Sequence, residues 1–114
     1  MSSLSGTALA DYGAEVFKRD RFTCVYCGFD GRPFDNWMQL SLEHILPKSS
    51  GGNDASENLV TACRTCNSIV SRMRFPEQAS KEHILRDKKE RVTRRREEFH
   101  KWWLNMLHRY ITSV

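Results

Sequence analysis

The sequence predicts a small α+β domain, in which a cysteine-rich core is preceded by one helix and followed by one long helix or several. Three observations support this fold class. Four cysteines form two Cys-x-x-Cys pairs that are 35 residues apart. Extended segments and turns lie between the pairs, and helical spacing dominates after them. The 114 residues suit a single domain, with a core over residues 20–73 and a basic helical extension over residues 76–112.

The N-terminal helix is predicted over residues 7–20. Leu9, Tyr12, Val16 and Phe17 fall on one stripe at helical spacing. We therefore expect an amphipathic helix that turns this stripe toward the rest of the domain.

The segment between the cysteine pairs predicts turns and two extended stretches. Residues 31–37 are interpreted as a loop, and residues 38–45 alternate apolar and polar side chains, as a half-buried strand does. Residues 47–58 are rich in turn formers, and residues 59–62 form a second short strand or extended segment. The alternation places Met38, Leu40 and Leu42 on one face and Gln39, Ser41 and Glu43 on the other.

Helices are predicted over residues 64–73 and from Pro76 to about Ile111. Proline suits the first turn of a helix, where its missing N–H costs nothing. A stripe with a spacing of seven residues runs along the second helix, and aromatic residues thicken its end: Leu85, Val92, Phe99 and Met106, then Trp102, Trp103 and Tyr110. We interpret these aromatic residues as core or dimer seam, with base stacking as the lesser alternative.

The charge of the chain is unevenly distributed. Residues 71–114 carry 12 Lys and Arg against 6 Asp and Glu, whereas residues 1–70 carry 6 against 8. A basic C-terminal part favours a polyanionic partner, and a solvated helix face is the alternative interpretation.

The start of the chain and its hydropathy predict a cytoplasmic protein. The first ten residues lack an apolar run behind a basic start, so no signal peptide is expected. No stretch approaches the roughly 20 apolar residues of a membrane span, so no membrane partner is expected.

The two cysteine pairs predict a structural zinc site formed by Cys24, Cys27, Cys63 and Cys66. Two intervening residues let one turn deliver both sulfurs of a pair, with Gly28 closing the first turn. The alternatives are a redox pair or two disulfides, which a reducing cytosol disfavours. Four thiolates close the coordination sphere of zinc, so a catalytic zinc is not expected.

Glu43 and His44 are the candidates for chemistry between the cysteine pairs. Cleavage of a phosphodiester needs a base for water and a cation for the phosphate, and imidazole and carboxylate suit these roles. Adjacent strand residues point to opposite faces, so the pair needs a distorted strand or separate roles.

The stretch from Cys24 to Asn67 resembles the HNH endonuclease family, the ββα-metal or treble-clef nucleases. The matching motifs are CVYCG, EHILPKSSGG, ENL and CRTCN. His44, Asn58 and Asn67 correspond to the three signature positions, so the chain is an H-N-N version in the four-cysteine, zinc-containing branch.

The resemblance implies a metal-dependent DNA endonuclease and a role for each residue. His44 would activate water, Glu43 and Asn67 would bind one Mg²⁺ or Mn²⁺, and Asn58 would hold the turn through its side chain. Products would carry 5′-phosphate and 3′-hydroxyl ends. Most family members have Asp where this chain has Glu43, and the longer side chain predicts lower activity. The alternatives are a structural role for His44, a surface carboxylate for Glu43 and a helix cap for Asn67.

The cationic residues nearest these motifs are candidates for phosphate contacts: Lys48, Arg64, Arg72, Arg74, Arg94 and Arg95. Arg94, Arg95 and Arg96 spread around a helix, so they cannot share one contact. Two other functions stay open. One is a zinc treble clef that binds DNA without cleaving it, and the other is a subunit of a restriction or defence complex. A homodimer through the C-terminal helix is a further hypothesis, since a double-strand cut needs two active sites.

Overall fold

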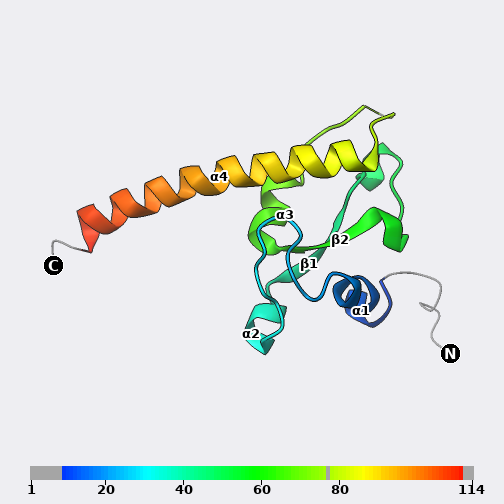
Figure 1. The fold of residues 1–114 in the computed structure, drawn as a ribbon, viewed down its shortest axis with the longest axis horizontal. Coiled ribbons are helices and arrows are strands. Elements are labelled where there is room, and N and C mark those ends of the chain that lie inside the picture. Colours follow the sequence, from blue (N-terminus) through cyan, green and yellow to red (C-terminus); the bar gives the residue numbers. More distant parts are fainter. Residues whose placement is uncertain (1–8, 77, 112–114) are drawn as a thin grey trace.

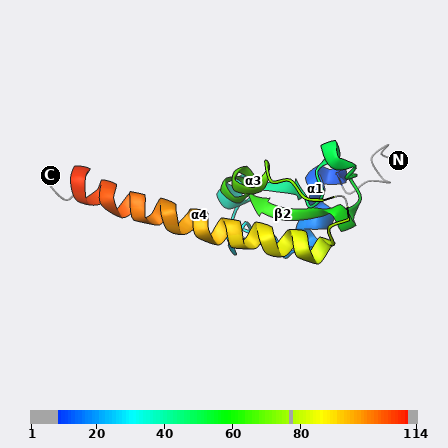
Figure 2. The same cartoon turned by 90° about the horizontal axis from the view of Figure 1, so that it is seen from above.

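A two-stranded antiparallel sheet lies at the centre of the computed structural model, which describes residues 9–76 and 78–111. Strand β1 (Leu40–His44) pairs with β2 (Leu59–Cys63), with Leu42 opposite Thr61. Helix α1 covers one face of the sheet, and α3 and α4 cover the other (Figures 1 and 2). The α+β class and the zinc-type core with flanking helices are therefore as predicted.

Helix α1 (Ala10–Arg19) forms within the predicted range, of which residues 7 and 8 lie outside the described part of the chain. Asp11, Tyr12 and Gly13 have positive φ angles, so the helix is broken near its start. The predicted stripe is wrong at Tyr12, whose side chain is 86% exposed, because the break turns it away from the sheet. A Cβ on Gly13 would lie 2.6 Å from Leu42, so the close approach of α1 to β1 requires glycine here.

Residues 31–37 are not only a loop, since Phe34–Trp37 form the one-turn helix α2. Pro33 precedes this helix with an extended backbone, and its carbonyl accepts from Trp37 N at 2.8 Å. This short turn delivers the chain to β1, which starts at Leu40 rather than at residue 38.

The predicted alternation along β1 is wrong in one respect, because Glu43 is buried, with 4% of its surface exposed. The prediction assumed that one face of the sheet meets solvent. Both faces are covered, by α1 and by α3 with α4, so the polar side of β1 is enclosed too. Met38, which the alternation placed on the apolar side, is 41% exposed because it precedes the strand.

The predicted turn region 47–58 holds two short 3-10 helices, Lys48–Ser50 and Ser56–Asn58. The Gly-Gly pair between them has a steric reason. A Cβ on Gly52 would lie 1.8 Å from the carbonyl oxygen of Leu46, so only glycine lets the loop close this tightly.

Strand β2 is buried along its whole length and leads directly into α3 (Arg64–Val70). Cys63 is the N-cap of α3, and its Sγ accepts from Cys66 N at 3.5 Å. The helix ends three residues earlier than predicted, at Val70, which is buried against α4.

Helix α4 (Lys81–Tyr110) is the longest element, and it begins five residues after the predicted start. Its N-cap is Ser80, whose Oγ accepts from His83 N at 3.1 Å, whereas Pro76 lies in the preceding turn. The buried stripe is also different from the predicted one. It comprises Ile84, Lys88 and Val92, a spacing of four, because the buried positions of α4 all lie within its first twelve residues.

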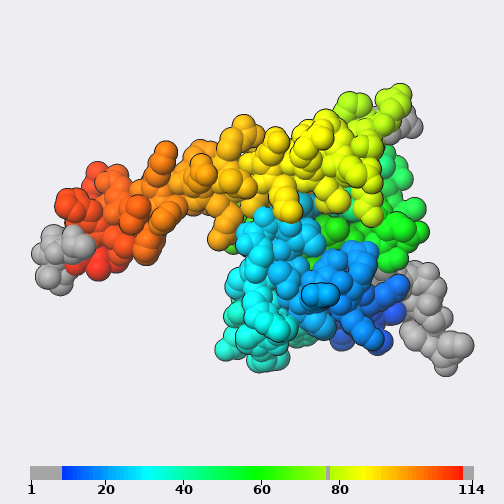
Figure 3. Space-filling model, in the orientation of Figure 1, coloured from blue at the N-terminus to red at the C-terminus, as the bar shows by residue number. Residues whose placement is uncertain are grey.

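The C-terminal end of α4 projects beyond the core, and the molecule measures 58 × 35 × 20 Å (Figure 3). Between Val92 and Trp103 the helix still borders a cavity of about 690 Å³ that Tyr26 and Cys27 also line. Its large apolar side chains are exposed there: Phe99, Trp102, Trp103, Leu104 and Tyr110. None of the helices in the described ranges has the length and apolar character needed to cross a bilayer.

Candidate functional site

The four cysteines come together where the turn that carries Cys24 and Cys27 meets the start of α3. We call this turn, residues 24–29, the knuckle. The four sulfur atoms all lie within 4.8 Å of one another, and Cys27 Sγ is 3.8 Å from Cys63 Sγ. A tetrahedral zinc site with bonds of about 2.3 Å has sulfur–sulfur edges of roughly 3.8 Å. The four thiols therefore fit a zinc ion, and no disulfide joins them. Zinc would fix the knuckle, β2 and α3 relative to one another.

The knuckle is also tied to the sheet by its backbone. Val25 N donates to Thr61 O at 3.0 Å, and Cys24 N donates to Phe29 O at 3.0 Å. Burial raises the pKa of the Cys27 thiol to about 11. Since zinc binds thiolates, metal uptake must displace protons from this cluster.

Glu43 makes two charge-assisted contacts beneath α4. Its Oε2 accepts from Lys88 Nζ at 2.8 Å, and its Oε1 accepts from the Tyr26 hydroxyl. Burial raises the pKa of Tyr26 above its usual range, so this hydroxyl stays protonated and remains a donor. Both carboxylate oxygens are thus engaged by protein donors. A divalent cation at Glu43 would have to displace these donors, so its role as a metal ligand stays a prediction. The surface-carboxylate alternative is wrong, because Glu43 is buried.

His44 lies next to Glu43 but belongs to a different set of contacts. Its Nε2 is 2.8 Å from Asp54 Oδ1, and Asp54 Oδ2 accepts from Lys48 Nζ at 3.0 Å. Hydrogen bonds from His44 and then from Lys48 lower the pKa of Asp54. The imidazole is 28% exposed, so it is held in one orientation while solvent still reaches it.

Asn58 links the two ends of the loop that separates the strands. Its Oδ1 accepts from Leu46 N at 2.9 Å, and its Nδ2 donates to Leu46 O at 3.0 Å and to Asn53 O at 2.9 Å. This side chain therefore acts on the backbone close to His44, and it forms no hydrogen bond with the side chain of Glu43 or Asn67.

Asn67 points from the middle of α3 toward the edge of β1. Its Nδ2 donates to Ser41 Oγ at 2.9 Å, and Ser41 Oγ donates to Ala62 O at 3.0 Å. The helix-cap alternative is wrong, because Cys63 caps α3. Asn67 also lines a shallow groove of about 370 Å³ between β1 and α3, which we call the α3 groove; its lining residues are Leu40, Ser41, Arg64, Asn67, Ser68 and Ser71.

The three residues predicted to take part in the chemistry, Glu43, His44 and Asn67, each have different hydrogen-bond partners. Within the described chain, Glu43 contacts Tyr26 and Lys88, His44 contacts Asp54, and Asn67 contacts Ser41. No hydrogen bond or ion pair joins any two of the three side chains. A site formed by all three would have to exchange some of these protein contacts for a shared ligand.

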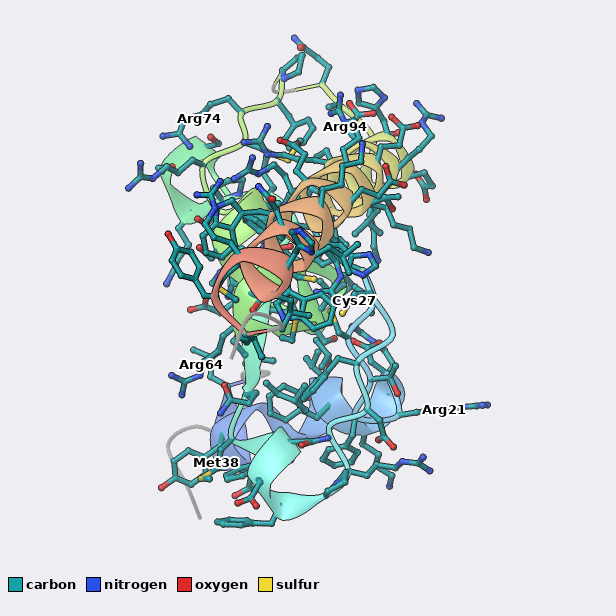
Figure 4. All side chains as sticks on the ribbon, turned by 90° about the vertical axis from the view of Figure 1, so that its left-hand side faces the viewer. Arg21, Cys27, Met38, Arg64, Arg74 and Arg94 are labelled. Atoms are coloured by element: carbon teal, nitrogen blue, oxygen red, sulfur yellow. The ribbon has the colours of Figure 1, made fainter. Side chains whose placement is uncertain are left out.

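The predicted phosphate-binding residues lie in three different places. Arg64, Arg72 and Arg74 belong to α3 and the segment after it, and all three are exposed. Figure 4 shows Arg64 and Arg74 projecting from one flank of the molecule, with Cys27 and Arg21 on the other. Lys48 is bound to Asp54 in the loop near His44. Arg94 and Arg95 lie on α4, where Arg95 pairs with Glu98 at 3.1 Å and stacks over Phe99.

Sequence reasoning missed three residues that contact the site: Tyr26, Asp54 and Lys88. The burial of Lys88 could have been predicted from the sequence, because the residue lies midway between Ile84 and Val92 on the buried stripe of α4. A lysine at such a position needs a buried partner. Asp54 and Tyr26 carry no comparable signal, since their partners depend on the folded loop and knuckle.

Comparison with known proteins supports the family resemblance. The sequence profile of the family described as HNH endonuclease matches residues 24–83. The chain is also 36% identical, over 55 residues, to the type 4 apparatus protein DotN of Legionella pneumophila subsp. pneumophila. That alignment covers 48% of this chain and 22% of DotN, so the chain corresponds to only a small part of that relative. No solved structure is significantly similar to the chain.

Proposed function

The chain belongs to the HNH endonuclease family, and on this premise we propose that it binds nucleic acid through the flank formed by α3 and the segment after it. The observation that carries the proposal is the composition of the α3 groove. Guanidinium, amide and hydroxyl groups line it, and none of the described residues that line it is acidic. Such donors match the oxygens of a phosphate backbone.

The residues beside the groove extend its positive charge. Arg72 and Arg74 lie in the segment that follows α3 and are exposed. Arg74 projects from the same flank as Arg64 (Figure 4). Neither of them, nor Arg64, makes an ion pair with a carboxylate within the described residues. Arg64 in the groove and two guanidinium groups in the segment after α3, all without a carboxylate partner, support contacts to phosphates, which position a nucleic acid without reading its sequence.

Zinc has a structural part in this function. The four cysteines hold the start of α3 against the knuckle, and Arg64 is the residue between Cys63 and Cys66 that opens the helix. The metal therefore sets the position of the first arginine of the groove. Removing zinc is expected to abolish binding together with the fold.

Metal-dependent hydrolysis of DNA is the second candidate, and one observation favours it. His44 is oriented by Asp54 and remains partly exposed, as a general base for water must be. The engagement of Glu43 by Lys88 and Tyr26 opposes this candidate, because no ligand pair for a divalent cation is formed.

One pair of experiments tests both candidates. Fluorescence anisotropy with labelled duplex and single-stranded DNA should show binding that weakens steeply as salt rises. Supercoiled plasmid incubated with Mg²⁺, Mn²⁺ or EDTA should stay intact if the protein only binds. Metal-dependent nicking that His44→Ala abolishes would instead establish the hydrolytic candidate. A protein that binds neither form of DNA at low salt would refute the proposal and point to a protein assembly, as the name of DotN suggests for that relative.

A further inference from the structure

Lys88 places an ammonium group inside the protein, where its three donors meet three oxygens. Its Nζ lies 2.8 Å from Glu43 Oε2, 2.9 Å from His44 O and 2.8 Å from Ile45 O. The side chain is 1% exposed, although lysine is among the residues most rarely buried. All three N–H groups are satisfied, so the ammonium is a fully bound cation.

The surroundings of this ammonium have the chemistry of a site for a hard cation. One carboxylate and two backbone carbonyls are oxygen ligands of the kind that Mg²⁺ and Ca²⁺ take. The oxygens stand 2.8–2.9 Å from the nitrogen, however, and Mg²⁺ needs about 2.0–2.1 Å. The cage therefore has the size of an ammonium group.

Two aromatic residues further enclose the ion pair between Lys88 and Glu43. The Tyr26 hydroxyl occupies the other oxygen of Glu43, and the ring of Phe75 has its centroid 6.0 Å from Lys88 Nζ. Phe75 comes from the segment between α3 and α4. The cage is thus closed from the knuckle on one side and from this segment on the other, which leaves little access for a hydrated ion.

The cation comes from outside the matched part of the chain. The HNH profile matches as far as residue 83, and Lys88 follows in α4. The carboxylate that precedes the signature histidine is thus neutralised by a residue that the profile match does not include. Glu43, rather than a shorter acid, reaches both Lys88 and Tyr26 across the interface between β1, the knuckle and α4.

We propose that the ammonium of Lys88 is a built-in cation, which takes the place of the divalent ion at Glu43 and excludes it. The proposal concerns the cation at Glu43 alone and does not rest on nucleic-acid binding. Lys88 also has a second effect. Its hydrogen bonds to His44 O and Ile45 O hold the backbone of the signature histidine in place. A protein that binds DNA without cleaving it is consistent with this arrangement.

The first test uses the zinc-loaded full chain and Mn²⁺ as a paramagnetic probe. In ¹H–¹⁵N spectra, millimolar Mn²⁺ should leave the amide signals of Glu43, His44 and Ile45 no broader than those of the core of α1. Selective broadening of these three signals in the wild-type protein would overturn the proposal, whatever the protein does to DNA. This experiment uses only the wild-type protein, so it tests the proposal even if the variants described next fail to fold.

The second test removes the ammonium while keeping an unbranched side chain that ends one atom short of Nζ. Lys88→Met should lower the melting temperature by several degrees, and Mn²⁺ should restore part of that loss by entering the vacated cage. Lys89→Met, at the exposed neighbouring position, is the matched control and should behave as wild type with and without Mn²⁺. Adding Glu43→Gln to Lys88→Met should remove the Mn²⁺ response. A Lys88→Met protein that melts like wild type, or that folds without any response to Mn²⁺, would contradict the proposal.

Discussion

The side chain of Asn58 and the backbone of Leu46 exchange two hydrogen bonds, through Oδ1 to the N–H at 2.9 Å and through Nδ2 to the carbonyl at 3.0 Å. Beyond His44 the ladder gains one more backbone hydrogen bond, from Ile45 N to Asn58 O at 2.8 Å. The Asn58 side chain then adds two hydrogen bonds at Leu46, where the backbone turns into the loop.

Replacing Asn58 by alanine should lower the free energy of unfolding by about 1–3 kcal/mol, because both polar groups of Leu46 lose their partner. Urea denaturation of the zinc-loaded protein measures this change. Asn105→Ala is the control, since Asn105 is exposed on α4 and alanine favours a helix. Equal stabilities of Asn58→Ala and wild type would show that water replaces the amide at no cost.

Removing zinc should unfold the core, because the bonds from the four sulfur atoms to the metal would hold the first cysteine turn, β2 and α3 together. One zinc ion per chain is expected by elemental analysis, and Cys66→Ala should contain none. Chelation should abolish the cooperative thermal transition, and added zinc should restore it. A chelated protein that keeps its transition would mean that the apolar core alone holds the fold.

Zinc retention should also depend on pH. Since burial raises the pKa of the Cys27 thiol to about 11, protons compete with the metal for this sulfur. The competition grows as pH falls, so a fixed concentration of chelator should strip zinc faster at pH values below neutral than above it. A colorimetric zinc assay over a pH series checks the sign, and a rate that does not change with pH would contradict it.

Arg64 should contribute to nucleic-acid affinity through one phosphate contact. Arg64→Gln is expected to weaken binding similarly for different sequences and to reduce the slope of log affinity against log salt by about 1. Arg21→Gln is the matched control, because Arg21 projects from the opposite flank (Figure 4). Similar losses in both variants would indicate attraction by overall charge and would argue against a defined groove.

A homodimer through the C-terminal part of α4, which carries the exposed aromatic residues, remains a proposal. Sedimentation velocity tests it. Trp102 and Trp103 are 66% and 46% exposed, and their burial between two chains would supply apolar contact area. Wild type should then associate as its concentration rises, whereas Trp102→Ser with Trp103→Ser should stay monomeric. A wild-type protein that is monomeric at every concentration would exclude this seam.

The zinc core was predictable from the sequence because its signal is local. The cysteine pairs, the turn formers and the start of α3 each depend on neighbours in the chain, and the structure places them as expected. The burial of Glu43 was not predictable in the same way, because its partner Lys88 lies 45 residues later and on a different helix. The alternation of apolar and polar residues in a strand predicts which face of the strand is apolar. It does not predict whether a helix far along the chain will cover the polar face.

The errors at the helix ends have equally specific causes. Tyr12 fits a helical stripe in the sequence, but left-handed backbone angles at residues 11–13 displace it. Pro76 suits a helix start, but Ser80 offers a side-chain acceptor and begins α4 instead. In both cases the local backbone conformation or cap decides where the helix starts, although the residue pattern is correct for the rest of the helix.

The long, half-free α4 has a consequence for how the protein moves through solution. The radius of gyration is 16.4 Å, against about 13 Å for a typical domain of this length. Beyond Val92, 18 residues of helix extend for about 27 Å. A single chain of this shape meets more friction than a sphere of equal mass, so it should elute early from a gel-filtration column and tumble faster about its long axis than across it. Early elution is therefore expected of the monomer itself.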